Sequence, residues 1–175
     1  MSELIDTFET NAREAVATVE RCKYAPGAVR QAVEQITKNL GRIVVGAAEF
    51  IDPQLAGVLQ ELPGVILKPA DEQLAKAEAG ITGAFAGIAS SGSVCVALGP
   101  PLAAAASLLM PLHIVLLSTD RIVARPRDLF DEACLGGEGL RRNLVFITGP
   151  SATADMGPLV RGVHGPHRLY ILLLE

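Results

Sequence analysis

The segment from residue 79 to residue 119 contains no Asp, Glu, Lys or Arg, and this places the strongest constraint on the fold. A membrane-spanning helix needs about 20 consecutive apolar residues. Turn-forming residues at 90–93, 99–101 and 111 divide the segment into pieces too short to span a bilayer. We therefore expect it to form the interior of a folded domain, with no membrane span.

The order of apolar patterns predicts an α/β fold. Half of the 175 residues are hydrophobic but only 4% are aromatic, so Ala, Val, Ile and Leu must build the core, as in helices packed on a mostly parallel sheet. We expect a three-layer α/β/α arrangement in a single domain, residues 1–175, with the N-terminal helices of residues 1–40 packed on it. Asp52 is expected to cap the third helix, with Pro53 at its first position. The predicted helices are 2–21, 28–40, 53–62, 71–79, 102–110 and 126–134, and the predicted strands are 42–46, 65–67, 80–89, 93–98, 113–117, 121–124, 143–148 and 169–174.

The charge and the cysteines exclude several classes of protein. Fifteen Lys and Arg against 19 Asp and Glu give a net charge of −4, whereas a nucleic-acid-binding protein needs a basic surface that displaces counterions. Cys22, Cys95 and Cys134 are widely spaced and form no Cys-x-x-Cys pair, so neither a disulfide framework nor a zinc or iron–sulfur site is expected. Charged residues in the first 20 positions exclude a signal peptide, which predicts a cytoplasmic protein.

The end of the chain carries the clearest indication of a binding site. An apolar strand leads into a turn of small and hydroxyl-bearing residues, an order typical of a polar site at the carboxyl edge of an α/β sheet. Gly149 is expected to turn the chain sharply after Thr148. Ser151 is expected to cap a short helix that continues through Thr153 and Asp155. The free N–H groups of that helix would bind an anion; an ordinary capped turn is the equally weighted alternative.

Two Arg and two His follow this turn within eight residues. Gly162 and Gly165 would let the backbone approach a ligand, while the basic side chains converge on a carboxylate or a phosphate. A His beside a turn is more often a hydrogen-bonded anchor than a catalytic base, and no nucleophile–base pair is evident. The basic residues are Arg161, His164, His167 and Arg168.

A second candidate constellation lies in the Gly-rich segment 80–93. Its hydroxyls could line a pocket beside the anion site; they belong to Thr82, Ser90, Ser91 and Ser93. The simpler interpretation is a Gly-rich strand against which a helix packs closely. His113 accompanies a buried apolar strand, so a core histidine is expected there rather than a ligand.

These segments together resemble the LUD-domain family. The resemblance is carried by GITGAFAGIASSGS at 80–93, PLHIVLL at 111–117, DRIV at 120–123, ITGPSATAD at 147–155 and GVHGP at 162–166. It covers roughly the last hundred residues closely. The resemblance implies a fold similar to the ribose-phosphate isomerase and CoA-transferase-like group. It also implies a non-redox role in bacterial oxidation of L-lactate to pyruvate, with no cofactor on this chain and iron–sulfur clusters on partner subunits.

The site residues and the resemblance together point to a small carboxylate or a phosphorylated ligand. No catalytic residue and no metal ligand is assigned. The residues expected to contact the ligand are Thr82, Ser91, Ser93, Thr148, Gly149, Ser151, Thr153, Asp155, Arg161, His164 and Arg168.

Three positions depart from the family pattern, which usually has an acidic residue where this chain has Phe85, Ser90 and Gly157. These losses weigh against an acid–base role but leave anion binding untouched. Two other functions stay open. One is a stand-alone CoA-transferase-like or cyclo-ligase-like enzyme for an anionic substrate, which needs a catalytic carboxylate. The other is an assembly module that uses the helix predicted at 2–21.

Overall fold

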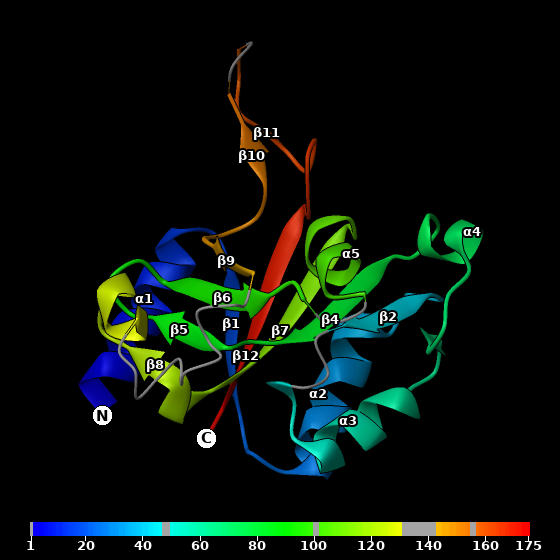
Figure 1. Cartoon of the computed structure of the whole chain (residues 1–175), viewed down its shortest axis with the longest axis horizontal. Helices are drawn as coiled ribbons and strands as arrows, with labels where there is room; N and C mark the ends of the chain where they lie inside the picture. Colours follow the sequence, from blue (N-terminus) through cyan, green and yellow to red (C-terminus); the bar gives the residue numbers. More distant parts are fainter. Residues whose placement is uncertain (1, 47–49, 100–101, 131–142, 155–156) are drawn as a thin grey trace.

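The fold is organised around a parallel sheet. The computed structural model describes residues 2–46, 50–99, 102–130, 143–154 and 157–175 (Figure 1). Within these ranges the sheet has the strand order β1-β12-β7-β4-β2-β3, and each neighbouring pair is parallel. The strands are β1 (Thr18–Cys22), β2 (Ile43–Gly46), β3 (Val65–Ile66), β4 (Ala79–Gly83), β7 (Leu112–Ser118) and β12 (Arg168–Leu174).

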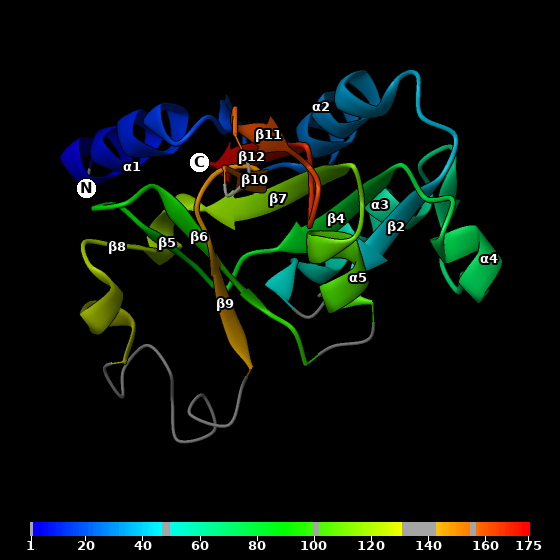
Figure 2. The same ribbon diagram turned by 90° about the horizontal axis from the view of Figure 1, so that it is seen from above.

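Helices cover both faces of the sheet. Side chains alternate between the faces, so that Leu116 of β7 packs with α2 (Pro26–Thr37) and α3 (Pro53–Gln60), whereas Val115 packs with α1 (Ser2–Glu14). Figure 2 shows α2 and α5 (Ala103–Leu108) on opposite sides of β7 and β4. The predicted three-layer α/β/α class with a mostly parallel sheet is therefore confirmed.

The glycines of β2 and β4 allow α5 to lie directly on the sheet. A Cβ atom at Gly80 would overlap the backbone of Ala106, and one at Gly46 would overlap that of Leu102. The simpler interpretation of the Gly-rich segment was a strand against which a helix packs closely, and at Gly80 the structure has this arrangement.

A second sheet packs beside the first, with the strand order β8 (Ile122–Val123), β5 (Ala86–Ile88), β6 (Ser93–Ala97) and β9 (Leu144–Ile147). The predicted hairpin at residues 90–92 joins β5 and β6, which are antiparallel. The predicted continuous strand 80–89 is wrong. The backbone N–H of Ala84 donates to Leu116 in the parallel sheet, whereas that of Phe85 donates to Cys95 in the second sheet. The chain therefore changes sheets between these two residues.

The first predicted helix is also too long. α1 ends at Glu14, and the chain then turns at Val16, whose φ of 69° lies in the left-handed region. The residues after the turn form β1, which pairs along its whole length with β12 at the far end of the sequence. This long-range pairing overrides the helical spacing of the apolar residues, because sheet partners outweigh local propensity.

The remaining elements differ from the predictions mainly in length. Asp52 caps α3 as expected, and its carboxylate accepts the N–H of Gln54 at 2.8 Å. The helix predicted at 71–79 is the shorter α4 (Asp71–Leu74). Where a helix was predicted at 126–134, the structure has a 3₁₀ turn, η3 (Pro126–Phe130), and residues 131–134 lie outside the described ranges. A 3₁₀ turn, η2 (Thr119–Arg121), follows β7. No helix within the described ranges is long and apolar enough to cross a membrane.

Candidate functional site

The closing segment of the chain lies at the amino edge of the parallel sheet. Residues 162–167 lead into the start of β12, and the backbone N–H groups of His167 and Arg168 donate to the carbonyl of Pro111, just before β7. Figure 1 shows the hairpin of this segment at one end of β12 and the C-terminus at the other. The expectation of a carboxyl-edge site here is wrong, because the strand that precedes the turn, β9, belongs to the second sheet, and the segment meets the parallel sheet only at the amino end of β12.

Ser151 begins a hairpin rather than a helix. Its N–H donates to the carbonyl of Pro166, and its carbonyl accepts the N–H of Gly162, both at 2.9 Å. The hairpin strands are β10 (Ala152–Thr153) and β11 (Val160–Arg161). The predicted capped helix is therefore wrong, and so is the anion site at its N-terminus. Asp155 lies outside the described residues.

Ser91, Ser93 and Thr148 form a chain of hydrogen-bonded hydroxyls. The Oγ atoms of Ser91 and Ser93 are 2.6 Å apart, and Ser93 Oγ is 2.6 Å from Thr148 Oγ1. The middle member, Ser93, is buried, whereas Ser91 is half-buried and Thr148 is exposed. Gly149, with φ +70°, packs against the backbone of Ala15 at the end of α1 and fixes the turn. These four predicted residues are brought together by the structure.

Thr82 belongs to a different, fully buried pair. Its Oγ1 lies 2.8 Å from Nε2 of His113, and neither residue is exposed. Burial lowers the pKa of His113 to about 3, so the imidazole is neutral at ordinary pH. Within the described part of the chain, its Nδ1 is buried without a hydrogen-bond partner. The expectation of a core histidine is confirmed.

The basic residues of the closing segment do not converge. Arg161 is exposed on β11. His164 and His167 border a pocket of about 280 Å³ together with Leu109, after α5. Arg168 lines a separate groove of about 320 Å³ beside α2. No single ligand contact surface therefore includes all the basic residues that the sequence pattern suggested.

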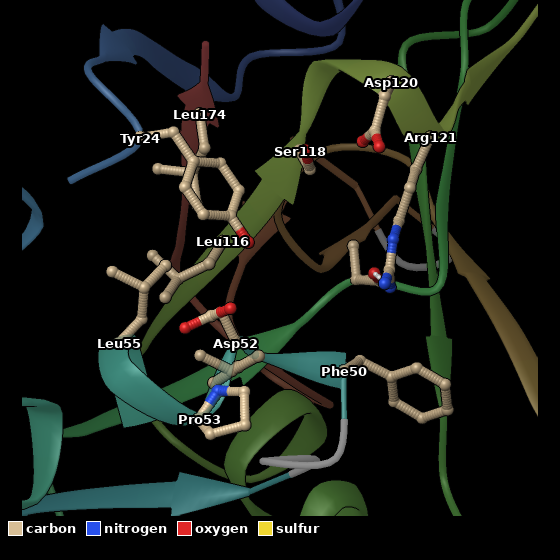
Figure 3. Close-up of a pocket in the computed structure, with 12 residues that line it drawn as sticks. Tyr24, Phe50, Asp52, Pro53, Leu55, Leu116, Ser118, Asp120, Arg121 and Leu174 are labelled. Atoms are coloured by element: carbon tan, nitrogen blue, oxygen red, sulfur yellow. Dashed lines mark hydrogen bonds between the residues drawn. The ribbon is translucent and has the colours of Figure 1, made fainter. Parts of the chain in front are cut away.

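A larger pocket, of about 450 Å³, opens at the carboxyl edge of the parallel sheet (Figure 3). It lies beyond the ends of β12, β7 and β4 and is completed by the segments that follow β1 and β2, where ligands bind in open α/β sheets. Figure 3 shows Tyr24 and Asp52 on one side and Asp120 and Arg121 on the other. We call it the carboxyl-edge pocket. Its polar residues are Tyr24, Asp52, Ser118, Asp120 and Arg121, and its apolar residues are Phe50, Ile51, Pro53, Leu55, Ala84, Leu116 and Leu174.

The polar groups of the carboxyl-edge pocket differ in charge and in partners. Arg121 Nη1 donates a long hydrogen bond of 3.5 Å to the Ala84 carbonyl, and among the described residues Arg121 forms no ion pair. Burial, followed by the charge of Asp52, raises the pKa of Tyr24, so its hydroxyl stays protonated at neutral pH. The pocket therefore offers one cation, two carboxylates and two hydroxyls.

Phe85 supports one wall of this pocket. Its ring meets the ring of Phe50 edge to face, with centroids 5.7 Å apart and an interplanar angle of 87°. The wall is therefore aromatic at a position where the resemblance led us to expect an acid. Ser90 and Gly157, the other two departures, are exposed.

Sequence reasoning missed the carboxyl-edge pocket. The available signal was Asp120-Arg121, a charged pair separated by two residues from the predicted strand 113–117 and part of the segments that carry the family resemblance. Tyr24 was hidden because the strand before it, β1, was predicted as the end of a helix.

No metal site emerges from the described residues, which contain no group of three or more His, Cys, Asp or Glu able to hold an ion. Cys22 and Cys95 are buried free thiols in separate core clusters. Burial raises the pKa of both thiols, that of Cys95 to about 11. Cys134 lies outside the described residues.

Comparison with known proteins identifies the family. The model of the LUD domain matches residues 54–174, which include Ser118, Asp120 and Arg121 of the carboxyl-edge pocket. The chain belongs to the LUD-domain family. A solved DUF162 family protein from Deinococcus radiodurans has the same fold, with a TM-score of 0.72 and 21% identity over 99% of this chain and 98% of that one.

Three bacterial proteins are similar to this chain in sequence. Lactate utilization protein C from Halalkalibacterium halodurans is 35% identical over 134 residues, covering 74% of this chain and 57% of that protein. Lactate utilization protein C from Deinococcus radiodurans is 28% identical over 179 residues, covering 99% and 80%. An uncharacterized protein from Neisseria meningitidis is 34% identical over 98 residues, covering 55% of this chain and 42% of its own length. This LUD-domain chain thus spans about half the length of two of these relatives.

Proposed function

We propose that this LUD-domain protein is a non-redox component of a bacterial L-lactate utilization system. In this role it binds a small carboxylate or a phosphorylated ligand in the cytoplasm and acts with iron–sulfur partner proteins that transfer the electrons. Two relatives are named lactate utilization protein C, and this likeness supports the choice of system.

The observation that carries the ligand class is Arg121 in the carboxyl-edge pocket. A guanidinium binds a carboxylate or a phosphate through paired N–H donors. Among the described residues, Arg121 uses one long hydrogen bond, to Ala84, and so keeps donors for a ligand. We therefore place the primary ligand contact at Arg121.

The hydroxyl chain and the hairpin provide a second location for ligand contact. Thr148 and Ser151 lie beside the surface turn, and His164 lies on the loop that follows β11. If this location binds the ligand, alanine substitution of Ser151 and His164 will weaken binding while Arg121→Gln leaves it unchanged. The opposite result will assign the ligand to the carboxyl-edge pocket.

The partner proposal is tested by anaerobic purification of the tagged, full-length protein from its native host under gentle conditions. We expect iron–sulfur proteins to co-purify, detected by their visible absorbance and by mass spectrometry. Isolation of the protein alone, from cells growing on L-lactate, would contradict the proposed system.

A second candidate function is favoured by the two carboxylates of the carboxyl-edge pocket. The resemblance led us to expect acidic residues at the positions of Phe85, Ser90 and Gly157, where this chain has none. Asp52 and Asp120 supply acidic groups in the pocket instead. With them, a stand-alone CoA-transferase-like or cyclo-ligase-like enzyme has candidate acid–base residues. Turnover of an acyl-CoA and a small carboxylate by the purified protein, abolished in Asp52→Asn or Asp120→Asn, would establish this function in place of the first.

A further inference from the structure

The carboxyl-edge pocket places its cation and its carboxylate acceptor on different walls. Arg121 runs along one side, with its guanidinium next to the carbonyl of Ala84, while Asp52 points into the open space from the other side (Figure 3). A ligand that spans this space meets a group that binds anions at one end. At the other end it meets a group that binds hydrogen-bond donors.

Asp52 is held in place by its role at the start of α3. The Oδ1 atom accepts the N–H of Gln54 at 2.8 Å, and the following Pro53 fixes the first turn of the helix. Oδ2 makes no hydrogen bond within the described residues, so it can accept one from a ligand hydroxyl. Such a hydrogen bond is charge-assisted and therefore stronger than one between neutral groups.

The rest of the pocket suits a short alkyl chain. Leu55, Leu116 and Leu174 contribute apolar surface to the pocket lining. The Tyr24 hydroxyl, protonated because burial raises its pKa, adds a donor near Asp52. The volume of about 450 Å³ accommodates a small organic acid together with water.

We infer that the carboxyl-edge pocket selects a 2-hydroxy acid, with the ligand carboxylate on Arg121, its hydroxyl on Asp52 and its alkyl group against the leucines. This inference rests on the proposed function, since it presumes that Arg121 binds a carboxylate. It goes further in assigning the preference for a hydroxyl to Asp52. A 2-keto acid has no hydroxyl to donate and brings a carbonyl oxygen towards a carboxylate, so it binds more weakly.

The test compares three acids of the same chain length. L-lactate has a 2-hydroxyl, pyruvate a 2-keto group and propionate neither, and the affinity of the whole protein for each is measured by calorimetry or by NMR titration. We expect L-lactate to bind at least about tenfold more tightly than propionate or pyruvate, since a site that hydrogen-bonds a ligand hydroxyl discriminates against analogues without it.

Matched variants assign the two contacts. Asp52→Asn keeps the helix cap through its amide oxygen but presents N–H donors to the pocket, so the preference for L-lactate over propionate should fall to about unity. Asp71→Asn removes the same charge from an exposed position outside the pocket and should keep the preference. Arg121→Gln should weaken binding of all three acids by at least about tenfold, whereas Arg127→Gln, a change to an exposed residue outside the pocket, should have no effect.

The outcomes separate the inference from the proposed function. Equal binding of all three acids, lost in Arg121→Gln, would overturn the preference for a hydroxy acid and leave carboxylate binding intact. A preference for L-lactate that survives Asp52→Asn would also overturn the assignment. Binding of none of the acids at millimolar concentration would contradict carboxylate binding at Arg121, and with it the carboxylate form of the proposed function.

Discussion

At the scale of single residues, Gly80 shows how tightly the layers are packed. A side chain there meets the backbone of Ala106 in α5, which cannot move aside as a flexible side chain can. We predict that Gly80→Ala lowers the free energy of unfolding by about 3 kcal/mol, an overpacking effect. Urea denaturation measures the change.

Gly57→Ala is the matched control for Gly80→Ala. Gly57 lies inside α3, and a Cβ atom there meets nothing within 4 Å. The control should raise the free energy of unfolding by about 0.5–1 kcal/mol, because Ala is the better helix former. If both variants have the same stability as the wild type, α5 does not rest on β4 as described.

His113 makes the stability of the protein depend on pH. Its pKa is about 3 in the folded protein, below the ordinary value of 6.5, so the unfolded chain binds more protons between these two values. The stabilisation is complete above pH 6.5 and decreases as the pH falls towards 3, by up to about 1.4 kcal/mol per pH unit. Denaturation midpoints measured from pH 7 to pH 5 should show this decrease.

His113→Gln should flatten the pH dependence between pH 7 and 5, since glutamine does not titrate. His164→Gln, at an exposed position, should leave it unchanged. Asp6, whose pKa is lowered by its hydrogen bond to Arg21, contributes only at lower pH. An unchanged slope in His113→Gln would show that another group dominates in this range.

At the scale of elements, the β10–β11 hairpin has little support of its own. Each strand has two residues, and Leu159, Val160 and Val163 are exposed. Isolated two-stranded hairpins are marginally stable in water. We predict that the amide hydrogens of β10 and β11 exchange at least about 100-fold faster than those of β7 and β12, which open only on global unfolding. Hydrogen exchange read by NMR tests this, and equal protection of the two regions would contradict it.

Elements with a local cause were predictable from sequence, and those with a distant cause were not. Asp52-Pro53 starts α3 because the cap and its Gln54 partner are two residues apart. Ser151 carries a similar capping signal, but its hydrogen bonds go to Pro166 and Gly162 across a hairpin. The capping signal therefore predicted the start of α3 correctly, because the partner of Asp52 is local. It predicted a helix wrongly at Ser151, because the partners of Ser151 lie farther along the chain.

At the scale of the whole molecule, the carboxyl-edge pocket depends on strand order. Tyr24, Asp52 and Arg121 are far apart in the sequence, and they meet because β1, β2 and β7 end at the same edge of one sheet. The α/β class followed from composition and pattern, but the strand order did not. The sequence therefore directed attention to the closing segment, while the pocket formed elsewhere.

The proposed role makes a prediction at the level of the cell. In a strain that lacks this gene, expression of Arg121→Gln should fail to restore growth on L-lactate, although the protein accumulates to the wild-type level. Growth on pyruvate should be normal, because the proposed system acts in the step that forms pyruvate from L-lactate. Arg127→Gln is the control and should restore growth on both carbon sources; restoration by Arg121→Gln would show that this guanidinium is dispensable.

The position of β12 has a consequence for folding on the ribosome. β12 lies between β1 and β7, so these two strands have no common neighbour until residues 168–174 have been made. At about 5–20 residues per second, β1 waits about 8–30 seconds after its own synthesis with an unpaired edge. The nascent chain therefore exposes the unpaired edge of β1 for most of its translation, and from residue 118 onward also that of the apolar strand β7, which makes it a natural client for chaperones that bind extended segments.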